Sequence, residues 1–293
     1  MDRVKSEADV EDKNLDMEEN NQDIEEESPD AEEQETDQTE ESAENGKKPR
    51  KRRVGRTIAI SFGVLFVVLL AAVGVFLLTY YHADEEALRS LNSTKFVTIT
   101  EKKNGYLFDG PGEDRMFIFY PGARVEETAY APMLKTLALF GLDVYLVKMP
   151  FHLAVLDGDA AEDVIKEYDY KEWIIGGHSM GGVMAARYAS EHPDQIKAVI
   201  LLASYSVDKL NDPMMVLSIY GDQDGVLNMA DYEEAKQNYP SNFCELKIAG
   251  GNHALFGYYG KQRKDGTATI TAEDQQEMTV DFIMEHLEKL GSD

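Results

Sequence analysis

The first candidate for chemistry is Ser179, at the centre of the pentapeptide GHSMG at residues 177–181. The apolar run 173–175 before it is typical of a buried strand, and the segment 183–189 after it is typical of a helix. A serine between such elements projects from a sharp, strained turn, and the flanking glycines leave room for the close strand–helix crossing. The helix that follows directs its N-terminal amides toward a developing oxyanion. The pattern predicts that Ser179 is a nucleophile.

A serine hydroxyl needs a general base, and with this turn the expected order along the chain is serine, carboxylate, histidine. Three histidines follow Ser179: His192, His253 and His286. His192 lies at a helix end, and His286 lies inside the last amphipathic helix. His253 lies in the glycine-rich loop 249–257 after the last expected strand, from which a base could reach the serine. We therefore predict that His253 is the base.

The carboxylate is expected in the loop after the preceding strand, 216–220, where two candidates occur. Asp224 precedes Gly225, in a turn that could direct a carboxylate back toward the histidine. Asp222 could instead hold the turn by bonding backbone. We favour Asp224, which would fix the tautomer of His253 and stabilise its imidazolium form.

The oxyanion hole is expected to use two backbone amides. One belongs to the residue after the nucleophile, Met180, and the other to the loop after an earlier strand. The apolar run 117–120 is such a strand, and Gly122, Ala123 and Arg124 lie in the loop after it. We predict Met180 and Ala123 as donors, with the amides of Gly122 and Arg124 as alternatives to Ala123.

Other residue types give no sign of a cofactor or metal. His178 should point away from Ser179 and is expected to be structural, whereas His152 follows a strand and could line the pocket or have no chemical role. The sequence has no metal-ligand spacing, no phosphate-binding loop and no GxGxxG motif. Cys244 is the only cysteine, which excludes an intramolecular disulfide.

The elements that must position these residues alternate between strand and helix. Strand-like runs lie at 96–100, 106–108, 116–120, 144–148, 173–175, 198–202, 216–220 and 244–248. Helical patterns lie at 127–140, 159–168, 180–191, 230–239 and 273–290. The first three strands have no helices between them, as in a meander, and the rest predict a mainly parallel sheet of about eight strands with helices on both faces. The segment between Leu202 and Val216 is too short for a large cap.

The N-terminal part of the chain differs sharply in composition from the rest. Residues 1–46 carry a net charge of −17 and lack aromatic residues, so we expect a disordered acidic tail. Residues 47–56 carry +7, and no charge occurs from Thr57 to Tyr80. These 24 residues span about 36 Å as a helix, enough to cross about 30 Å of hydrocarbon.

Charge asymmetry around this run predicts the topology. The basic cluster precedes it, so the positive-inside rule places the N-terminus in the cytoplasm and the C-terminal domain outside the cell membrane. We expect a cytoplasmic tail at 1–56, a transmembrane signal-anchor at 57–81, a stalk at 82–94 and a folded domain at 95–293. The chain carries −26 overall, which leaves −16 from Thr57 onward and argues against nucleic acid as a partner. The tail could bind a cytoplasmic partner or act only as a solvating leader.

Four segments resemble a known family: the loop that starts YPGARVEE at residue 120, GGHSMGG at 176, YGDQDGV at 220 and GGNHALFGYYG at 250. Together they resemble small bacterial α/β-hydrolases with a proline-glycine oxyanion loop and a GGNHxxFGxYG histidine loop, over roughly residues 95–290. The resemblance implies the α/β-hydrolase fold, a triad of Ser179, Asp224 and His253, and oxyanion amides from 122–124 and Met180. The family often has a second glycine where this chain has Ala123.

The leading functional hypothesis is a carboxylesterase-like serine hydrolase acting on a small-molecule acyl substrate at the outer face of the membrane. Without a large cap, its open site would suit small or exposed acyl esters. Two alternatives remain at this point: a non-catalytic module that binds a ligand or partner, and a membrane-proximal lipase or peptidase. Pocket shape, which the sequence does not give, distinguishes among ester, thioester and amide substrates.

Overall fold

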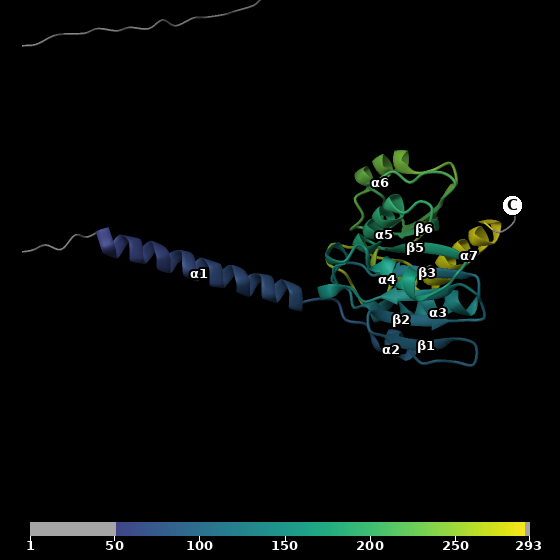
Figure 1. Ribbon diagram of the computed structural model, residues 1–293, viewed down its shortest axis with the longest axis horizontal. Helices are drawn as coiled ribbons and strands as arrows, with labels where there is room; N and C mark the ends of the chain where they lie inside the picture. The colour runs from purple at the N-terminus through teal and green to yellow at the C-terminus, as the bar shows by residue number, and fades with distance from the viewer. Residues whose placement is uncertain (1–50, 291–293) are drawn as a thin grey trace, which may run out of the picture. The chain divides into compact units, whose positions relative to one another are not determined.

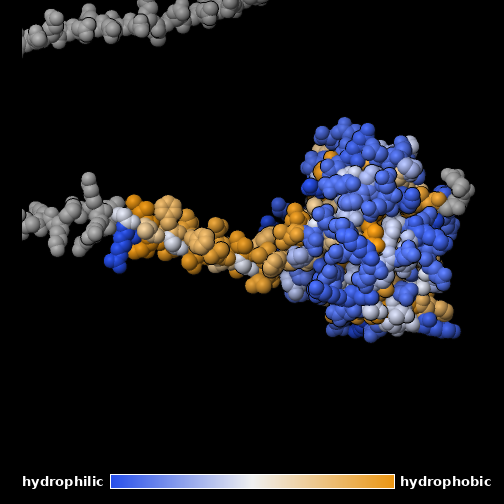
Figure 2. Space-filling view, in the orientation of Figure 1, coloured by the Kyte–Doolittle hydropathy of each residue, from blue (hydrophilic) through white to orange (hydrophobic). Residues whose placement is uncertain are grey.

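The computed structural model describes residues 51–290, and only the backbone of 51–54. The acidic segment expected at 1–46 lies outside the described residues. Helix α1 (Lys51–Leu78) contains the apolar run, and its stretch Gly55–Leu78 is long and apolar enough to span a bilayer. Its surface is largely hydrophobic (Figure 2). The helix ends at Leu78, so Tyr80 and Tyr81, which were expected within the span, lie beyond it.

The sheet has eight strands, as expected, in the order β1-β2-β4-β3-β5-β6-β7-β8. They are β1 (Thr98–Lys102), β2 (Gly105–Asp109), β3 (Arg115–Tyr120), β4 (Asp143–Val147), β5 (Glu172–His178), β6 (Ile196–Leu202), β7 (Met215–Gly221) and β8 (Phe243–Ile248). Strands β1, β2 and β4 pair antiparallel, and the other pairs are parallel. The predicted mainly parallel sheet is therefore confirmed.

The expected meander of the first three strands is wrong at its third member. Strand β2 pairs with β4, and β3 lies between β4 and β5. The physical reason is the crossover through helix α3 (Ala131–Leu139), which returns the chain parallel to β3 and places β4 between β2 and β3. No local pattern in the sequence specifies that insertion.

Helices cover both faces of the sheet (Figure 1). Helices α3 and α7 (Ala272–Leu290) pack with Phe117 and Phe119 of β3 in one core cluster. Helices α4 (Ala160–Glu167) and α5 (Met180–Glu191) pack on the other face, where Ile118 and Tyr120 point. Alternate residues of β3 thus serve opposite cores, as the two-residue period of a strand requires. Helix α6 (Met229–Ala235) follows β7.

The segment expected to be a stalk, 82–94, is instead packed onto the domain. It forms helix α2 (Glu85–Ser90), whose Ala87 is fully buried. The Asp84 side chain caps this helix, and the Asp84 amide donates to the carbonyl of Tyr258. The six residues of α2 do not by themselves predict this packing, because the burial of Ala87 depends on segments that are distant in the sequence.

The connection 203–214 joins β6 to β7 and contains no helix. The expectation that no large cap lies between β6 and β7 is therefore confirmed.

Candidate active site

Ser179 lies at the turn between β5 and α5 in a strained backbone conformation, with φ 53° and ψ −125°. Its amide donates to the carbonyl of Leu202 at 2.9 Å. A Cβ on Gly177 or on Gly181 would lie 2.3 Å from the carbonyl oxygen of Tyr120, so neither position accepts a side chain. The two glycines therefore permit the close crossing that holds Ser179 at the end of the strand.

His253 and Asp224 meet in a buried hydrogen bond. The distance from His253 Nδ1 to Asp224 Oδ2 is 2.8 Å, and each side chain is 1% exposed. The other carboxylate oxygen, Oδ1, accepts the amides of Val226 and Leu227, both at 2.8 Å. Because both oxygens of Asp224 are engaged, the carboxylate is fixed in the orientation that binds the imidazole.

Asp222, the alternative acid, has a different position. It is exposed, and its carboxylate accepts the amide of Gly250 at 2.7 Å. That hydrogen bond lowers the pKa of Asp222 below its usual value, and a hydrogen bond from the side chain of Gln223 makes a smaller contribution in the same direction. Asp222 therefore fastens the β7 loop to the histidine loop, while Asp224 contacts His253.

Asp265 is a site residue that the sequence did not reveal. Its carboxylate accepts four backbone amides: that of the adjacent Gly266 at 2.8 Å and, from the two site loops, those of Gly225 at 3.1 Å, His253 at 3.3 Å and Ala254 at 2.9 Å. It thereby holds the acid loop and the histidine loop together from a third segment. No sequence signal marks it, because its partner Gly225 lies 40 residues away.

Ser179 and His253 line the same cavity, which has a volume of about 190 Å³. Its remaining wall includes Met180, Val183 and Val226. Nε2 of His253 is buried and has no hydrogen-bond partner within residues 51–290. Serine–histidine hydrogen bonds are often loose in a hydrolase without substrate, so this free nitrogen is available to the serine or to a leaving group.

The backbone amides of the candidate oxyanion loop, residues 122–124, are not equivalent. Gly122 already donates to the hydroxyl oxygen of Tyr130 at 3.0 Å, and Arg124 donates to the carbonyl of His152 at 2.7 Å. The amides of Ala123 and Met180 have no acceptor in the part of the chain that the structure describes. Of the three loop residues considered from sequence, Ala123 is thus the one with a free donor.

His178 is buried, as expected of a structural residue, but it also contacts the site. Its Nδ1 lies 2.9 Å from the Tyr130 hydroxyl, and its ring centroid lies 4.5 Å from that of His253. Burial, and then the neighbouring His253, hold the pKa of His178 well below its usual value. A neutral His178 therefore links the candidate base His253 to Tyr130 and, through it, to the candidate oxyanion loop at 122–124. Tyr130 was not singled out from sequence.

His152 does not line the cavity that contains Ser179. Its Nδ1 lies 3.4 Å from Oε2 of Glu127, and its ring centroid lies 4.0 Å from that of Tyr80. The reading of His152 as a pocket residue is therefore not supported by its position.

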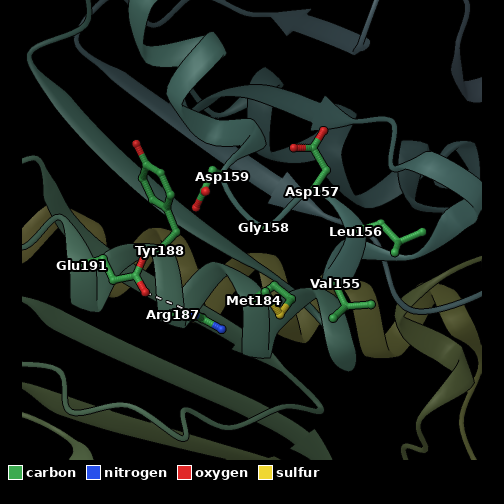
Figure 3. A pocket seen from close by; sticks show the side chains of 9 residues that line it. All are labelled: Val155, Leu156, Asp157, Gly158, Asp159, Met184, Arg187, Tyr188 and Glu191. Carbon is green, nitrogen blue, oxygen red and sulfur yellow. Dashed lines mark hydrogen bonds and ion pairs between the residues drawn. The ribbon is translucent and has the colours of Figure 1, made fainter.

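A second cavity, of about 330 Å³, lies along α5 (Figure 3). Its lining includes the carboxylates of Asp157, Asp159 and Glu191, and Glu191 pairs with Arg187. It contains no serine–histidine pair. Within residues 51–290, no cluster of three or more histidine, cysteine or acidic residues could hold a metal ion.

Comparisons with known proteins agree with this architecture. Mouse alpha/beta hydrolase domain-containing protein 10 matches with a TM-score of 0.51 at 10% identity, over 67% of this chain and 99% of that chain. A membrane phospholipase A, described as a bacterial virulence factor, matches with a TM-score of 0.51 at 12% identity, over 84% of this chain and 100% of that chain. At such identities the likeness shows the fold alone.

Sequence comparison is more specific. A protein of Mycobacterium phage D29, named "Putative non-heme haloperoxidase", is 30% identical over 115 residues, which cover 36% of this chain and 41% of that protein. The chain therefore matches less than half the length of this relative. Residues 116–277 match the model of the alpha/beta hydrolase family. That match extends over more than half of the chain and contains Ser179, Asp224 and His253, and the chain belongs to the alpha/beta hydrolase family.

Proposed function

We propose that this protein is a carboxylesterase-like serine hydrolase with Ser179 as nucleophile, His253 as base and Asp224 as acid. The observation that carries the proposal is the buried His253–Asp224 hydrogen bond beside a cavity shared with the strained Ser179. A binding module would have no need of this arrangement. We further propose that the bond cleaved is an acyl ester, although the same triad could also cleave a thioester or an amide.

The mechanism follows from the positions of the atoms. Ser179 Oγ attacks the acyl carbonyl and transfers its proton to Nε2 of His253, and Asp224 stabilises the resulting imidazolium. The amides of Ala123 and Met180 donate to the oxyanion of the tetrahedral intermediate. The imidazolium then protonates the leaving alkoxide. Water, deprotonated by the same histidine, hydrolyses the acyl-enzyme and releases the carboxylic acid.

The proposed location is the outer face of the cell membrane. Helix α1 contains one stretch long and apolar enough to span a bilayer, and the basic cluster 47–56 precedes its apolar core. The positive-inside rule then favours a cytoplasmic N-terminus and an external hydrolase domain.

Substitution of the nucleophile tests the proposed reaction. Ser179→Ala should abolish hydrolysis of p-nitrophenyl butyrate and labelling by a fluorophosphonate probe. Ser190→Ala, near the end of α5, is a matched control and should retain both. Undiminished labelling of Ser179→Ala would contradict the assignment, and tight ligand binding by a wild type without turnover would favour the binding-module alternative.

A further inference from the structure

The segment 79–81, directly after the candidate membrane span, forms hydrogen bonds with the oxyanion loop and the residues that follow it. Helix α1 ends at Leu78, and the carbonyl of Thr79 accepts Nε of Arg124 at 2.8 Å. The amide of Tyr81 donates to the carbonyl of Arg124 at 2.7 Å. The amide of Glu126 returns a hydrogen bond to the carbonyl of Tyr81 at 2.8 Å. Three residues reach at most about 11 Å, so the oxyanion loop must lie close to the end of the span.

The same edge of the sheet carries exposed apolar side chains. We define the apolar rim as Phe151, Val155, Leu156, Met180, Val207 and Val226, all of which are exposed. They follow the carboxyl ends of β4, β5, β6 and β7, the edge at which Ser179 lies. Single exposed apolar residues are ordinary, but a set of them around one active site indicates an interaction surface.

A short basic loop lies beside this edge. Lys261, Arg263 and Lys264 are exposed and form no ion pair within residues 51–290. The Arg263 amide donates to the hydroxyl oxygen of Tyr81 at 3.1 Å, so the loop is tied to the segment that leaves the span. Three unpaired cations in four residues stand out in a portion of the chain that carries −16.

From these observations we infer that the active-site edge rests on the bilayer surface at the C-terminal end of the span, and that the substrate is an acyl ester of an anionic amphiphile in that leaflet. The inference rests on the proposed serine hydrolase and adds its substrate class. The apolar rim enters the interface at the level of the ester bonds, and the basic loop attracts anionic headgroups. The cavity of about 190 Å³ admits the ester and the adjoining part of the acyl chain. The rest of the lipid stays in the membrane.

The first test separates reaction at the bilayer from reaction in solution. The full-length protein is reconstituted into vesicles of phosphatidylcholine with phosphatidylglycerol that contain a fluorogenic phosphatidylglycerol ester. The double variant Leu156→Asp, Val207→Asp should reduce hydrolysis of the vesicle ester at least tenfold while p-nitrophenyl butyrate turnover stays within twofold. The matched control is Leu139→Asp, Phe140→Asp, which removes two exposed apolar residues at the opposite edge and should change neither rate.

The charge of the basic loop is tested in the same vesicles. Hydrolysis by the wild type should rise with the phosphatidylglycerol fraction, and Lys261→Glu, Arg263→Glu should remove that dependence. Lys197→Glu, near the start of β6, is the control for a change of surface charge, and its hydrolysis should still rise with the phosphatidylglycerol fraction. Equal dependence in all three proteins would overturn the role of the basic loop.

A third measurement does not require activity. A fluorophore on Val207→Cys, in a Cys244→Ser background, should be quenched by brominated lipids, whereas the same label on Phe140→Cys should not. Absence of quenching at position 207 would overturn the membrane contact even if soluble esters are cleaved. Quenching without turnover of any ester would leave the contact standing and overturn the proposed enzyme.

Discussion

At the scale of single residues, the candidate triad is held by backbone amides. Asp224 accepts Val226 and Leu227 with one oxygen and contacts His253 with the other. Asp265 binds the amides around that histidine. The imidazole therefore has little freedom to rotate, which is the condition for a base to have one defined tautomer.

The two aspartates of the β7 loop should differ strongly in their effect on catalysis. Asp224→Asn should reduce kcat for p-nitrophenyl butyrate by about 10³–10⁴-fold, because an amide at this position favours the wrong tautomer of His253. Asp222→Asn keeps an oxygen that can accept the Gly250 amide and should reduce kcat by less than about tenfold. Equal losses in the two variants would mean that Asp224 is not the specific partner of the base.

His178 should make the stability of the domain depend on pH. Burial depresses its pKa in the folded protein, whereas the unfolded chain binds a proton near its ordinary pKa of about 6.5. The unfolded state therefore binds more protons below that pH, and the free energy of unfolding falls on acidification by up to about 1.4 kcal/mol per pH unit. The free energy of unfolding, measured in urea between pH 7.5 and 5, should fall less steeply for His178→Asn than for the wild type. The same dependence on pH in both proteins would contradict this prediction.

At the scale of elements, the site is assembled by neighbouring strands that end at one edge of the sheet. Strand β3 lies beside β5, so the oxyanion loop adjoins the turn at Ser179. Strand β7 lies beside β8, so the loop of Asp224 adjoins the loop of His253. Open parallel sheets place their sites at the carboxyl ends of strands for this reason.

The contact between the start of α5 and the end of β3 should tolerate no added methyl group. A Cβ on Gly181 would lie 2.3 Å from the oxygen of Tyr120 and 2.4 Å from that of Pro121, and both are backbone atoms. Gly181→Ala should cost about 3 kcal/mol or more in unfolding free energy. At Gly158 a Cβ meets only the flexible tip of Met184, so Gly158→Ala is the matched control. Unfolding in urea is monitored by Trp173 fluorescence. Equal midpoints for Gly181→Ala and Gly158→Ala would contradict this prediction.

At the level of the entire chain, the order of charge and hydropathy favours the proposed location of the hydrolase domain at the membrane. The basic cluster at 47–56, the apolar stretch Gly55–Leu78 and the immediate contacts of Tyr81 give the proposed active site a place near the membrane. The domain has a hydrophobic core cluster on each face of its sheet, and its single cysteine excludes an intramolecular disulfide.

The proposed topology predicts which side of the membrane each part occupies. In a Cys244→Ser background, Lys197→Cys, at the exposed start of β6 and away from the apolar rim, should react with a membrane-impermeant maleimide in intact cells. A cysteine at Asn20 should react only after permeabilisation, because the basic cluster retains the N-terminal side in the cytoplasm. The reverse pattern of labelling would place the hydrolase domain inside the cell.

Features that depend on local pattern could be predicted from the amino-acid sequence. Hydrophobic periodicity located all eight strands, the uncharged run located α1, and glycines around Ser179 located the turn. The triad candidates came from the order of residue types along the chain. The choice of Asp224 over Asp222 also came from local turn chemistry, and the structure places Asp224 against His253.

Contacts between distant segments became known only from the folded structure. It placed β4 between β2 and β3, and it paired the Gly122 amide with Tyr130, which leaves Ala123 as the free donor of the loop. It also joined Asp265 to the histidine loop and turned the expected stalk into part of the domain. The physical reason is that these contacts connect segments whose local sequence is compatible with many partners, so the choice among them is made by packing of the whole chain.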